Sequence, residues 1–275
     1  MRPAQRFPHT LKLTLAYDGT AYVGWQRQAT GTSVQGLLEE ALTRLEGAPV
    51  ACAAAGRTDA GVHALGQVAS AVLTREMRLD DLQRALNAVL PSDIRVTAVV
   101  GVPADFHARF SARRKTYHYR IRNGGIVSPF ERGYVWAIPS PLRLELMEEA
   151  AALLEGRHDF ASFQAAGSDV HTTTRTVLRS RMRVEPGATV GGGAGPSSGT
   201  LVVYEITGDG FLRHMVRAIV GTLVDVGLGR RRPESVGELL EARDRAQAGP
   251  TAPACGLFLV AVDYGSIEGS ILQET

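Results

Sequence analysis

The order of apolar and polar residues outlines most of the regular structure along the chain. In the first half, alternating or short apolar runs predict strands, and apolar residues repeating every three or four positions predict helices. Ser33 is a suitable N-cap for the first helix, and Gly47 and Pro49 end it. The expected elements are strands over 11–17, 50–55, 67–73 and 94–102, with helices over 33–45 and 80–89.

The second half repeats this succession of strands and helices. Its expected strands cover 116–121, 177–184, 200–207 and 257–262, and its expected helices cover 141–154, 211–226 and 236–243. The repeated order predicts an α+β fold of two sheet-plus-helix domains, at 9–111 and 112–265. Residues 186–199 consist largely of Gly, Pro and Ser, which predicts a flexible surface insert in the second domain.

Composition narrows the class of protein. The two cysteines, Cys52 and Cys255, lie far apart and lack CxxC spacing, which disfavours a disulfide framework and a cysteine-built zinc site. No apolar run approaches the roughly 20 residues that span a membrane, and the N-terminus lacks the apolar core of a signal peptide. We therefore expect a cytoplasmic protein that does not enter a membrane.

The distribution of charge is more informative than its sum. The net charge of +2 is too small to indicate nucleic-acid binding by itself. However, acidic residues gather in the expected helices at 37–46 and 142–155, whereas basic residues gather at 107–122. Such segregation can give one face of the protein a positive potential, and Arg side chains suit phosphates and stack on bases.

An Asp in a glycine-bounded turn is the first candidate for chemistry. The eleven residues GRTDAGVHALG at 56–66 place Asp59 between two expected strands, with Arg57 two positions before it. A carboxylate at such a junction can be aimed by rigid neighbours, and a nearby Arg keeps it ionised. The alternatives are an ordinary Asp-Ala-Gly turn and a structural ion pair.

A strand of alternating aromatic and basic residues is the second candidate. Alternation places Lys115, Tyr117 and Tyr119 on one face, with His118 and Arg120 on the other. An aromatic ring among cations can stack on an extruded base while the cations hold phosphates. The alternative is that at least one tyrosine belongs to the core and the cations are solvated.

The third candidate is the helix expected after Gly208-Asp209-Gly210. It would present Arg213, His214 and Arg217 within its first two turns, with the two arginines on one face. Such a helix can offer a guanidinium to a carboxylate or to phosphates. Surface arginines on an amphipathic helix are the plain alternative.

Metal and hydrolase signatures are absent from the sequence. There is no HExxH motif and no GxSxG motif, and Gly61 argues against a shared helical face for Asp59 and His63. A metal-dependent nuclease that uses Asp59 and His63 stays open as an alternative. A non-catalytic RNA-binding protein is the other one.

Taken in order, these segments resemble the tRNA pseudouridine(38–40) synthase family. The resemblance covers nearly the whole chain and shows no departure at the motif positions. It implies a pseudouridine synthase fold, in which two α+β domains flank a central active-site cleft, and a homodimer that binds the tRNA anticodon stem-loop. The stretches that carry it are YDGT at 17–20 with GWQ at 24–26, then 56–64, 106–121, 158–163, 210–221 and 256–264.

The resemblance also implies a reaction and roles for particular residues. Uridine at tRNA positions 38–40 would be flipped out and isomerised to pseudouridine without a cofactor or metal. Asp59 would be the catalytic aspartate, Tyr117 would stack on the target uracil, and Arg57 would extrude the nucleotide or fill its place. Arg217 would pair with Asp59. Further implied phosphate contacts are Arg109, Arg113, Arg114 and Lys115.

Overall fold

The computed structural model describes residues 10–165, 167, 170–185 and 199–265, which form two compact units. The first unit contains residues 10–113 together with 259–265, and the second contains residues 114–258. We had predicted a domain boundary between residues 111 and 112, with the last strand in the second domain. In the structure that strand crosses from the second unit into the first.

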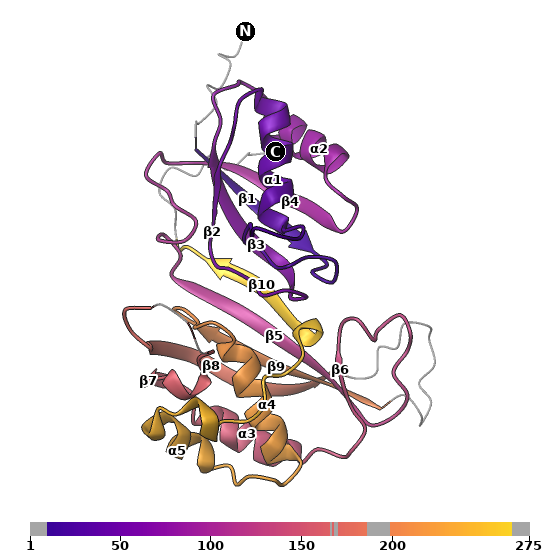
Figure 1. The fold of residues 1–275 in the computed structure, drawn as a ribbon, viewed down its shortest axis with the longest axis vertical. Coiled ribbons are helices and arrows are strands. Elements are labelled where there is room, and N and C mark those ends of the chain that lie inside the picture. Colours follow the sequence, from indigo (N-terminus) through magenta and orange to yellow (C-terminus); the bar gives the residue numbers. More distant parts are fainter. Residues whose placement is uncertain (1–9, 166, 168–169, 186–198, 266–275) are drawn as a thin grey trace. The chain divides into compact units, whose positions relative to one another are not determined.

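The first unit is an antiparallel sheet covered on one face by two helices (Figure 1). β1 lies between β3 and β4, and β2 pairs with β3. The elements are β1 (Thr10–Tyr17), α1 (Val34–Glu46), β2 (Cys52–Ala54), β3 (His63–Val72), α2 (Leu79–Val89) and β4 (Ile94–Val102), and β10 (Leu257–Asp263) closes the chain.

Local chemistry explains where α1 begins and ends. The Ser33 side chain accepts a hydrogen bond from the backbone N–H of Gly36, as an N-cap does. Gly47 adopts the left-handed conformation, with φ +83°, and its N–H bonds to the Thr43 carbonyl. Leu38 and Leu42 are fully buried, which fixes the face that packs on the sheet. Both predicted helix ends are confirmed.

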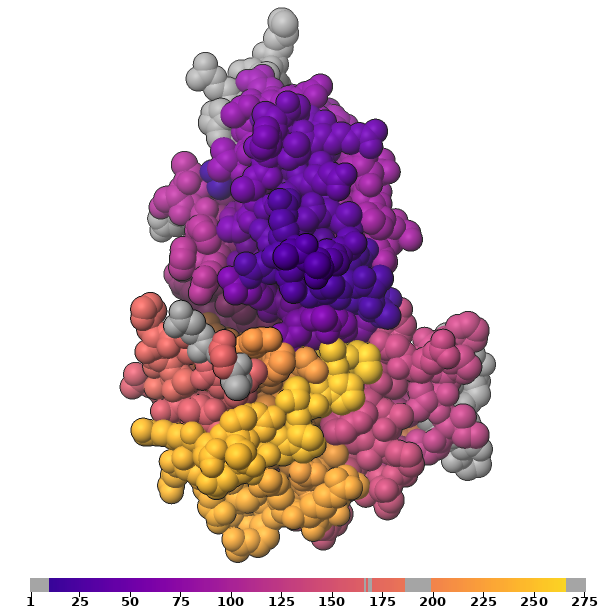
Figure 2. All heavy atoms as spheres, in the orientation of Figure 1, coloured from indigo at the N-terminus to yellow at the C-terminus, as the bar shows by residue number. Residues whose placement is uncertain are grey.

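The second unit has the strand order β5-β9-β8-β7, with every neighbouring pair antiparallel. Helices cover one face of this sheet, and the loop between β5 and β6 projects from the unit (Figures 1 and 2). Its elements are β5 (Arg114–Asn123), β6 (Trp136–Ile138), α3 (Leu144–Ala152), β7 (Gly156–Asp159), β8 (Thr174–Glu185), β9 (Thr200–Gly208), α4 (Met215–Gly227) and α5 (Ser235–Ala242), with short 3-10 turns at Ala161–Phe163, Arg245–Gln247 and Ala254–Gly256.

The structure confirms the α+β class and corrects several boundaries. β3 begins at His63, inside the motif that was expected to form a loop. α4 begins at Met215 and not at Phe211, because Leu212 is buried and Met215 N–H bonds to the Leu212 carbonyl in a turn. The short strands β6 and β7 were not predicted. The expected insert lies outside the described residues except for Gly199.

A buried ion pair secures the projecting loop of the second unit. The side chain of Arg122 on β5 is fully buried and donates to Glu131 of that loop from Nε and Nη2, with Nε 3.1 Å from Oε2. Among the described residues, Nη1 of Arg122 has no hydrogen-bond partner. Arg122, the last basic residue of the segment at 107–122, therefore does not contribute to an exposed positive face.

Removing one partner of this pair should destabilise the protein strongly. Glu131→Ala leaves a buried guanidinium uncompensated, and we expect the free energy of unfolding to fall by about 3–5 kcal/mol. Replacing both partners, Arg122→Met with Glu131→Leu, should be nearly neutral. Urea unfolding measures both changes.

The matched control is the exposed pair of Arg84 and Asp81. Asp81→Ala should cost under about 1 kcal/mol, because solvent screens an exposed pair. Similar losses for Glu131→Ala and Asp81→Ala would contradict the buried character of the Arg122 pair.

Candidate active site around Asp59

Asp59 lies in a short extended segment that leads from β2 into β3. Arg57 is exposed, Thr58 is buried and Asp59 is partly buried. This alternation fits an extended backbone in which the Thr58 side chain is buried and its two neighbours are more accessible to solvent. Within the described part of the chain, the Arg57 side chain makes no hydrogen bond or ion pair. It is therefore accessible to a ligand.

Buried polar side chains of β1 and β3 form hydrogen bonds that fix the segment. The hydroxyl groups of Tyr17 and Thr58 lie 2.8 Å apart and share a hydrogen bond. The Gln67 amide donates to the Gly56 carbonyl at 2.8 Å and approaches the Tyr17 hydroxyl at 3.4 Å. Since all of these side chains are buried, each hydrogen bond replaces contacts that water would otherwise supply.

The loop that precedes α1 holds the same segment from the side. The backbone N–H of Trp25 donates to the Thr58 carbonyl at 3.0 Å, and the backbone N–H of Gly61 donates to the Tyr22 carbonyl at 3.4 Å. Gly24 has φ +105°, and a Cβ there would lie 2.6 Å from the Thr58 carbonyl oxygen. Only glycine allows so close an approach with this backbone conformation.

The buried His63 joins the motif to the turn after β1. Its Nδ1 lies 3.1 Å both from the Gly19 N–H and from Oδ1 of Asp18. One nitrogen cannot accept from the first and donate to the second at the same time. The backbone N–H has a fixed direction, and Asp18 Oδ1 already accepts from Thr20. We therefore assign Nδ1 as the acceptor for Gly19.

Burial changes the acidity of Tyr17, the tyrosine of this hydrogen-bond network. It raises the pKa of Tyr17 to about 12, against a smaller lowering by the hydrogen bonds to Thr58 and Gln67. The Tyr17 hydroxyl is therefore protonated at neutral pH.

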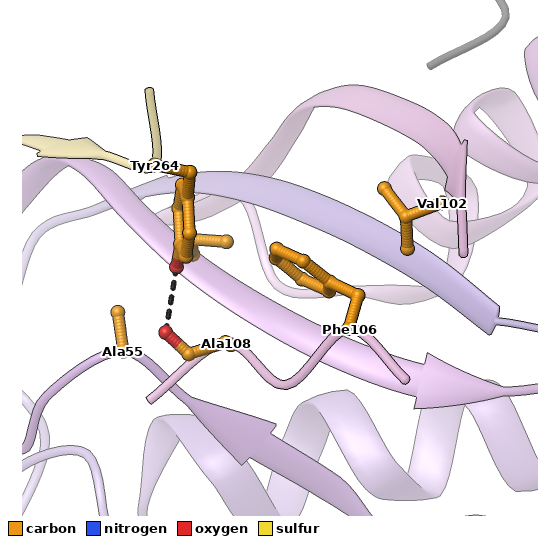
Figure 3. Close-up of a cluster of buried hydrophobic side chains, with 6 residues drawn as sticks. Ala55, Val102, Phe106, Ala108 and Tyr264 are labelled. Carbon is orange, nitrogen blue, oxygen red and sulfur yellow. Dashed lines mark hydrogen bonds between the residues drawn. The ribbon is translucent and has the colours of Figure 1, made fainter. Parts of the chain in front are cut away.

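A second loop of the first unit packs against the entrance to the Asp59 segment. Ala108 and Phe106 form a buried cluster with Ala55 and Tyr264, and the Tyr264 hydroxyl donates to the Ala108 carbonyl at 2.8 Å (Figure 3). Arg109 follows directly and is exposed. Arg109 and Asp59 thus lie on two loops that share one core.

The other predicted residues lie in the second unit. Tyr117 on β5 is buried, and its ring packs nearly perpendicular to that of Phe211, at a centroid distance of 5.1 Å. Tyr119 is also buried and donates to the Pro253 carbonyl at 2.8 Å, which indicates a structural role. Lys115 lies at the start of β5, opposite Gly208. Burial raises the pKa of Tyr119, and the charge of Arg217 opposes the shift.

Arg217 is the only one of the three predicted helix residues that lies within α4. Its Nε donates to the Ala252 carbonyl at 2.8 Å, and Ala252 N–H donates back to the Arg217 carbonyl at 3.1 Å. Arg213 precedes the helix, and His214 is its cap, with φ +61°. The shared helical face predicted for Arg213 and Arg217 is therefore wrong, because α4 begins late.

The described residues contain no group of three or more His, Cys, Asp or Glu that could hold a metal ion. No helix among them is long and apolar enough to cross a membrane.

Comparison with known proteins decides the family. The family model described as tRNA pseudouridine synthase matches residues 14–111 and 150–265. The chain belongs to the tRNA pseudouridine synthase family. Because the members of that family are isomerases that act on tRNA, this chain is one as well.

Individual relatives match over almost their whole length. The tRNA pseudouridine synthase A of Moorella thermoacetica is 46% identical over 92% of this chain and 99% of that protein. Those of Solidesulfovibrio magneticus and Myxococcus xanthus are 47% and 46% identical, and each match covers 91% of that protein and 93% or 92% of this chain. A solved Cbf5-Nop10-Gar1 complex matches with a TM-score of 0.31 and 14% identity, over 78% of this chain and 45% of that chain.

The anchors of Asp59 are the residues that sequence reasoning missed. Tyr17 and Gly24 belong to segments that carried the family resemblance, but the pattern gave neither a role. Gln67 was expected to start a strand and is fully buried. No local pattern indicated these residues, because their contacts with the Asp59 segment join positions that are distant in the sequence.

Removing the Tyr17 hydroxyl should loosen the Asp59 segment without unfolding the protein. We expect Tyr17→Phe to lower the free energy of unfolding by about 1 kcal/mol at pH 8, because one buried hydrogen bond is lost. The pKa of Tyr17 rises from 10.0 unfolded to about 12 folded, so its stabilisation is complete below pH 10 and disappears as the pH rises to 12.

Urea unfolding of both proteins at pH 8 and again between pH 10 and 12 measures this difference. The gap between wild type and Tyr17→Phe should narrow over that range. A gap that is constant or widens would contradict the assignment of Tyr17 as a neutral anchor.

Gly24→Ala tests the close approach of the loop to the Asp59 segment. Strain at positive φ and the clash with Thr58 should together cost about 2 kcal/mol or more and displace Asp59. The melting temperature in differential scanning calorimetry and the rate of uridine isomerisation should both fall. Gly237→Ala in α5 is the control, because a Cβ there meets nothing within 4 Å. Stability equal to the control would refute the constraint.

Proposed function

We propose that this chain converts uridine to pseudouridine at positions 38–40 of the tRNA anticodon stem-loop, with Asp59 as the catalytic carboxylate. Family membership supports the reaction class. The observation that supports Asp59 is its setting: the residue is partly buried, and it lies on a segment whose backbone and neighbouring side chains are hydrogen-bonded to two strands and a loop.

The anchoring network is what catalysis at this position requires. A catalytic group must hold its orientation while the substrate reacts, and side chains fixed by buried hydrogen bonds do this better than mobile ones. Thr58 is bonded through both its side chain and its carbonyl. The backbone that leads into Asp59, the next residue, is therefore fixed, while Asp59 itself is only partly buried.

The reaction exchanges one bond of the uracil for another. The bond from the ribose to the base nitrogen breaks, the uracil rotates, and a carbon of the ring takes the place of the nitrogen. The proton that leaves this carbon is balanced by the proton that the nitrogen gains. A carboxylate beside the sugar can assist as a nucleophile or as a base.

A base inside a stem must leave its stack before this chemistry can start. Extrusion costs about a few kcal/mol, and a cation or side chain that fills the vacated space offsets it. Arg57 suits this task because it is exposed and has no hydrogen-bond or ion-pair partner among the described residues. Arg109 is exposed and makes no ion pair with a described residue, which suits a phosphate contact.

The remaining parts of the proposal follow from the family resemblance. Tyr117 would stack on the target uracil, Arg217 would keep Asp59 charged, and Lys115 would contact a phosphate. Arg217 has a structural basis for precise placement, because the Ala252 carbonyl holds its Nε. A homodimer in the cytoplasm that uses a cleft between two domains, without a cofactor, completes the proposal.

Asp59→Asn should abolish isomerisation while preserving the fold. The substitution keeps the size of the side chain and removes its charge, so we expect a loss of about a thousandfold or more in kcat with little change in tRNA affinity. The measurement is the pseudouridine content of each position of an unmodified tRNA anticodon arm, after incubation with an excess of a metal chelator.

Asp80→Asn is the matched control, since Asp80 is also partly buried in the first unit but lies on α2. It should convert uridine at the wild-type rate. Appreciable turnover by Asp59→Asn would overturn the role of Asp59. Tight tRNA binding by the wild type without any conversion would overturn the proposed function and favour a binding protein.

A further inference from the structure

Phe110 is exposed to an extent that is unusual for its residue type. Its exposed fraction is 77%, although burying a phenyl ring is strongly favourable. It lies in the loop between β4 and β5, where Phe106 and Ala108 are buried. The loop therefore buries two of its apolar side chains and leaves the Phe110 ring in solvent.

The exposed ring stands on a rigid base. His107 Nδ1 accepts the backbone N–H groups of Arg109 at 3.1 Å and Phe110 at 3.4 Å, and Ser111 closes the turn with two hydrogen bonds to His107. Ala108 N–H also bonds to Ser70 Oγ on β3 at 3.1 Å. A flexible tip would leave these groups to water, so the hydrogen bonds hold in place the backbone that carries the ring.

Two nitrogen-rich side chains lie beside the ring. The His107 ring lies 4.4 Å from the Phe110 ring by centroids, tilted by 33°, and the Arg109 guanidinium carbon lies 5.5 Å from the Phe110 centroid. Arg109 is exposed and makes no ion pair with a described residue. The phenyl ring therefore has a supporting ring, a neighbouring cation and most of its surface in solvent.

We propose that Phe110, backed by His107 and flanked by Arg109, is a stacking platform for an unpaired base of the tRNA substrate next to the target uridine. This inference rests on the proposed function and deepens it. Single-stranded nucleic acids bind through exposed aromatic rings that stack on bases, together with cations that meet the phosphates. A protein partner would favour a broader apolar patch without the exposed cation.

The place of the platform in the fold fits this occupant. Ala108 packs against Ala55, which precedes Asp59 by four residues. Four residues span at most about 14 Å, and the two residues from Ala108 to Phe110 at most about 7 Å. The platform and the catalytic carboxylate therefore lie within reach of one RNA stem-loop.

Phe110→Ala should weaken tRNA binding and leave the chemistry nearly intact. Because one base–aromatic stack is lost, we expect KM and Kd for unmodified tRNA to rise roughly 5- to 100-fold, with kcat changed less than about twofold. Phe110→Trp should restore binding, whereas Phe110→Leu should not, because it keeps apolar area but has no aromatic face. An anticodon stem-loop RNA should quench the fluorescence of the indole that Phe110→Trp adds.

Phe130 supplies the matched control. It is a phenylalanine of nearly equal exposure, 75%, in the second unit, and no cation lies over its ring among the described residues. Phe130→Ala should leave KM, Kd and kcat unchanged, and RNA should not quench the indole that Phe130→Trp adds. Equal losses for the two alanine variants, or full rescue by Phe110→Leu, would overturn the platform.

Sedimentation velocity distinguishes the platform from a protein contact. A change in the self-association of Phe110→Ala with unchanged tRNA affinity would overturn the inference. Wild-type conversion in the kinetic assay tests the proposed function by itself. If the wild type failed to convert uridine, the Kd of tRNA for the wild-type, Phe110→Ala and Phe110→Trp proteins would still decide the platform.

Discussion

The hydrogen bond between the hydroxyl groups of Tyr17 and Thr58 joins the end of β1 to the segment that carries Asp59. It works together with the Gln67 amide on β3 and the Trp25 N–H, so the segment is held from three elements at once. Each such bond contributes only about 1 kcal/mol. Their combined effect is geometric, since together they restrict the conformation of the backbone before Asp59.

The same constraint explains why glycines and buried polar groups surround the motif. Gly24 lets the loop before α1 approach the Thr58 carbonyl, and Gly19 lets the turn after β1 approach the Val62 carbonyl, where a Cβ would lie 2.0 Å away. His63 and Gln67 satisfy backbone groups that such tight packing removes from water. Buried polar residues are costly for stability unless they are hydrogen-bonded, and here their hydrogen bonds hold the segment that carries Asp59.

Local signals in the sequence were sufficient for most of the helices and strands and for finding the motif. The cap at Ser33, the stop at Gly47 and the strand over 94–102 follow from side-chain chemistry within a few residues, and the structure agrees with them. The anchors of Asp59 could not be predicted in this way, because Tyr17 and Thr58 are 41 residues apart. Their pairing depends on which strands lie side by side, and periodicity carries no information about that.

Tertiary contacts also explain the predictions that were wrong. Arg122 belongs to the basic segment at 107–122, which was expected to help give one face a positive potential, but its side chain is buried and paired with Glu131. The helix was predicted to begin at Phe211, but a turn that buries Leu212 comes first, and α4 begins after it. In both cases a side chain is committed to a partner that is distant in the sequence or outside the regular element.

Amide hydrogen exchange of the wild-type protein without RNA tests the central claim most directly. If the segment is fixed before substrate binds, the amides of Gly61 and Val62 should exchange about as slowly as those at the ends of β1 and β3. The exposed turn at 27–32 should exchange rapidly in the same sample. Exchange of Gly61 and Val62 as fast as that turn would show that the Asp59 segment opens freely, and would contradict the account.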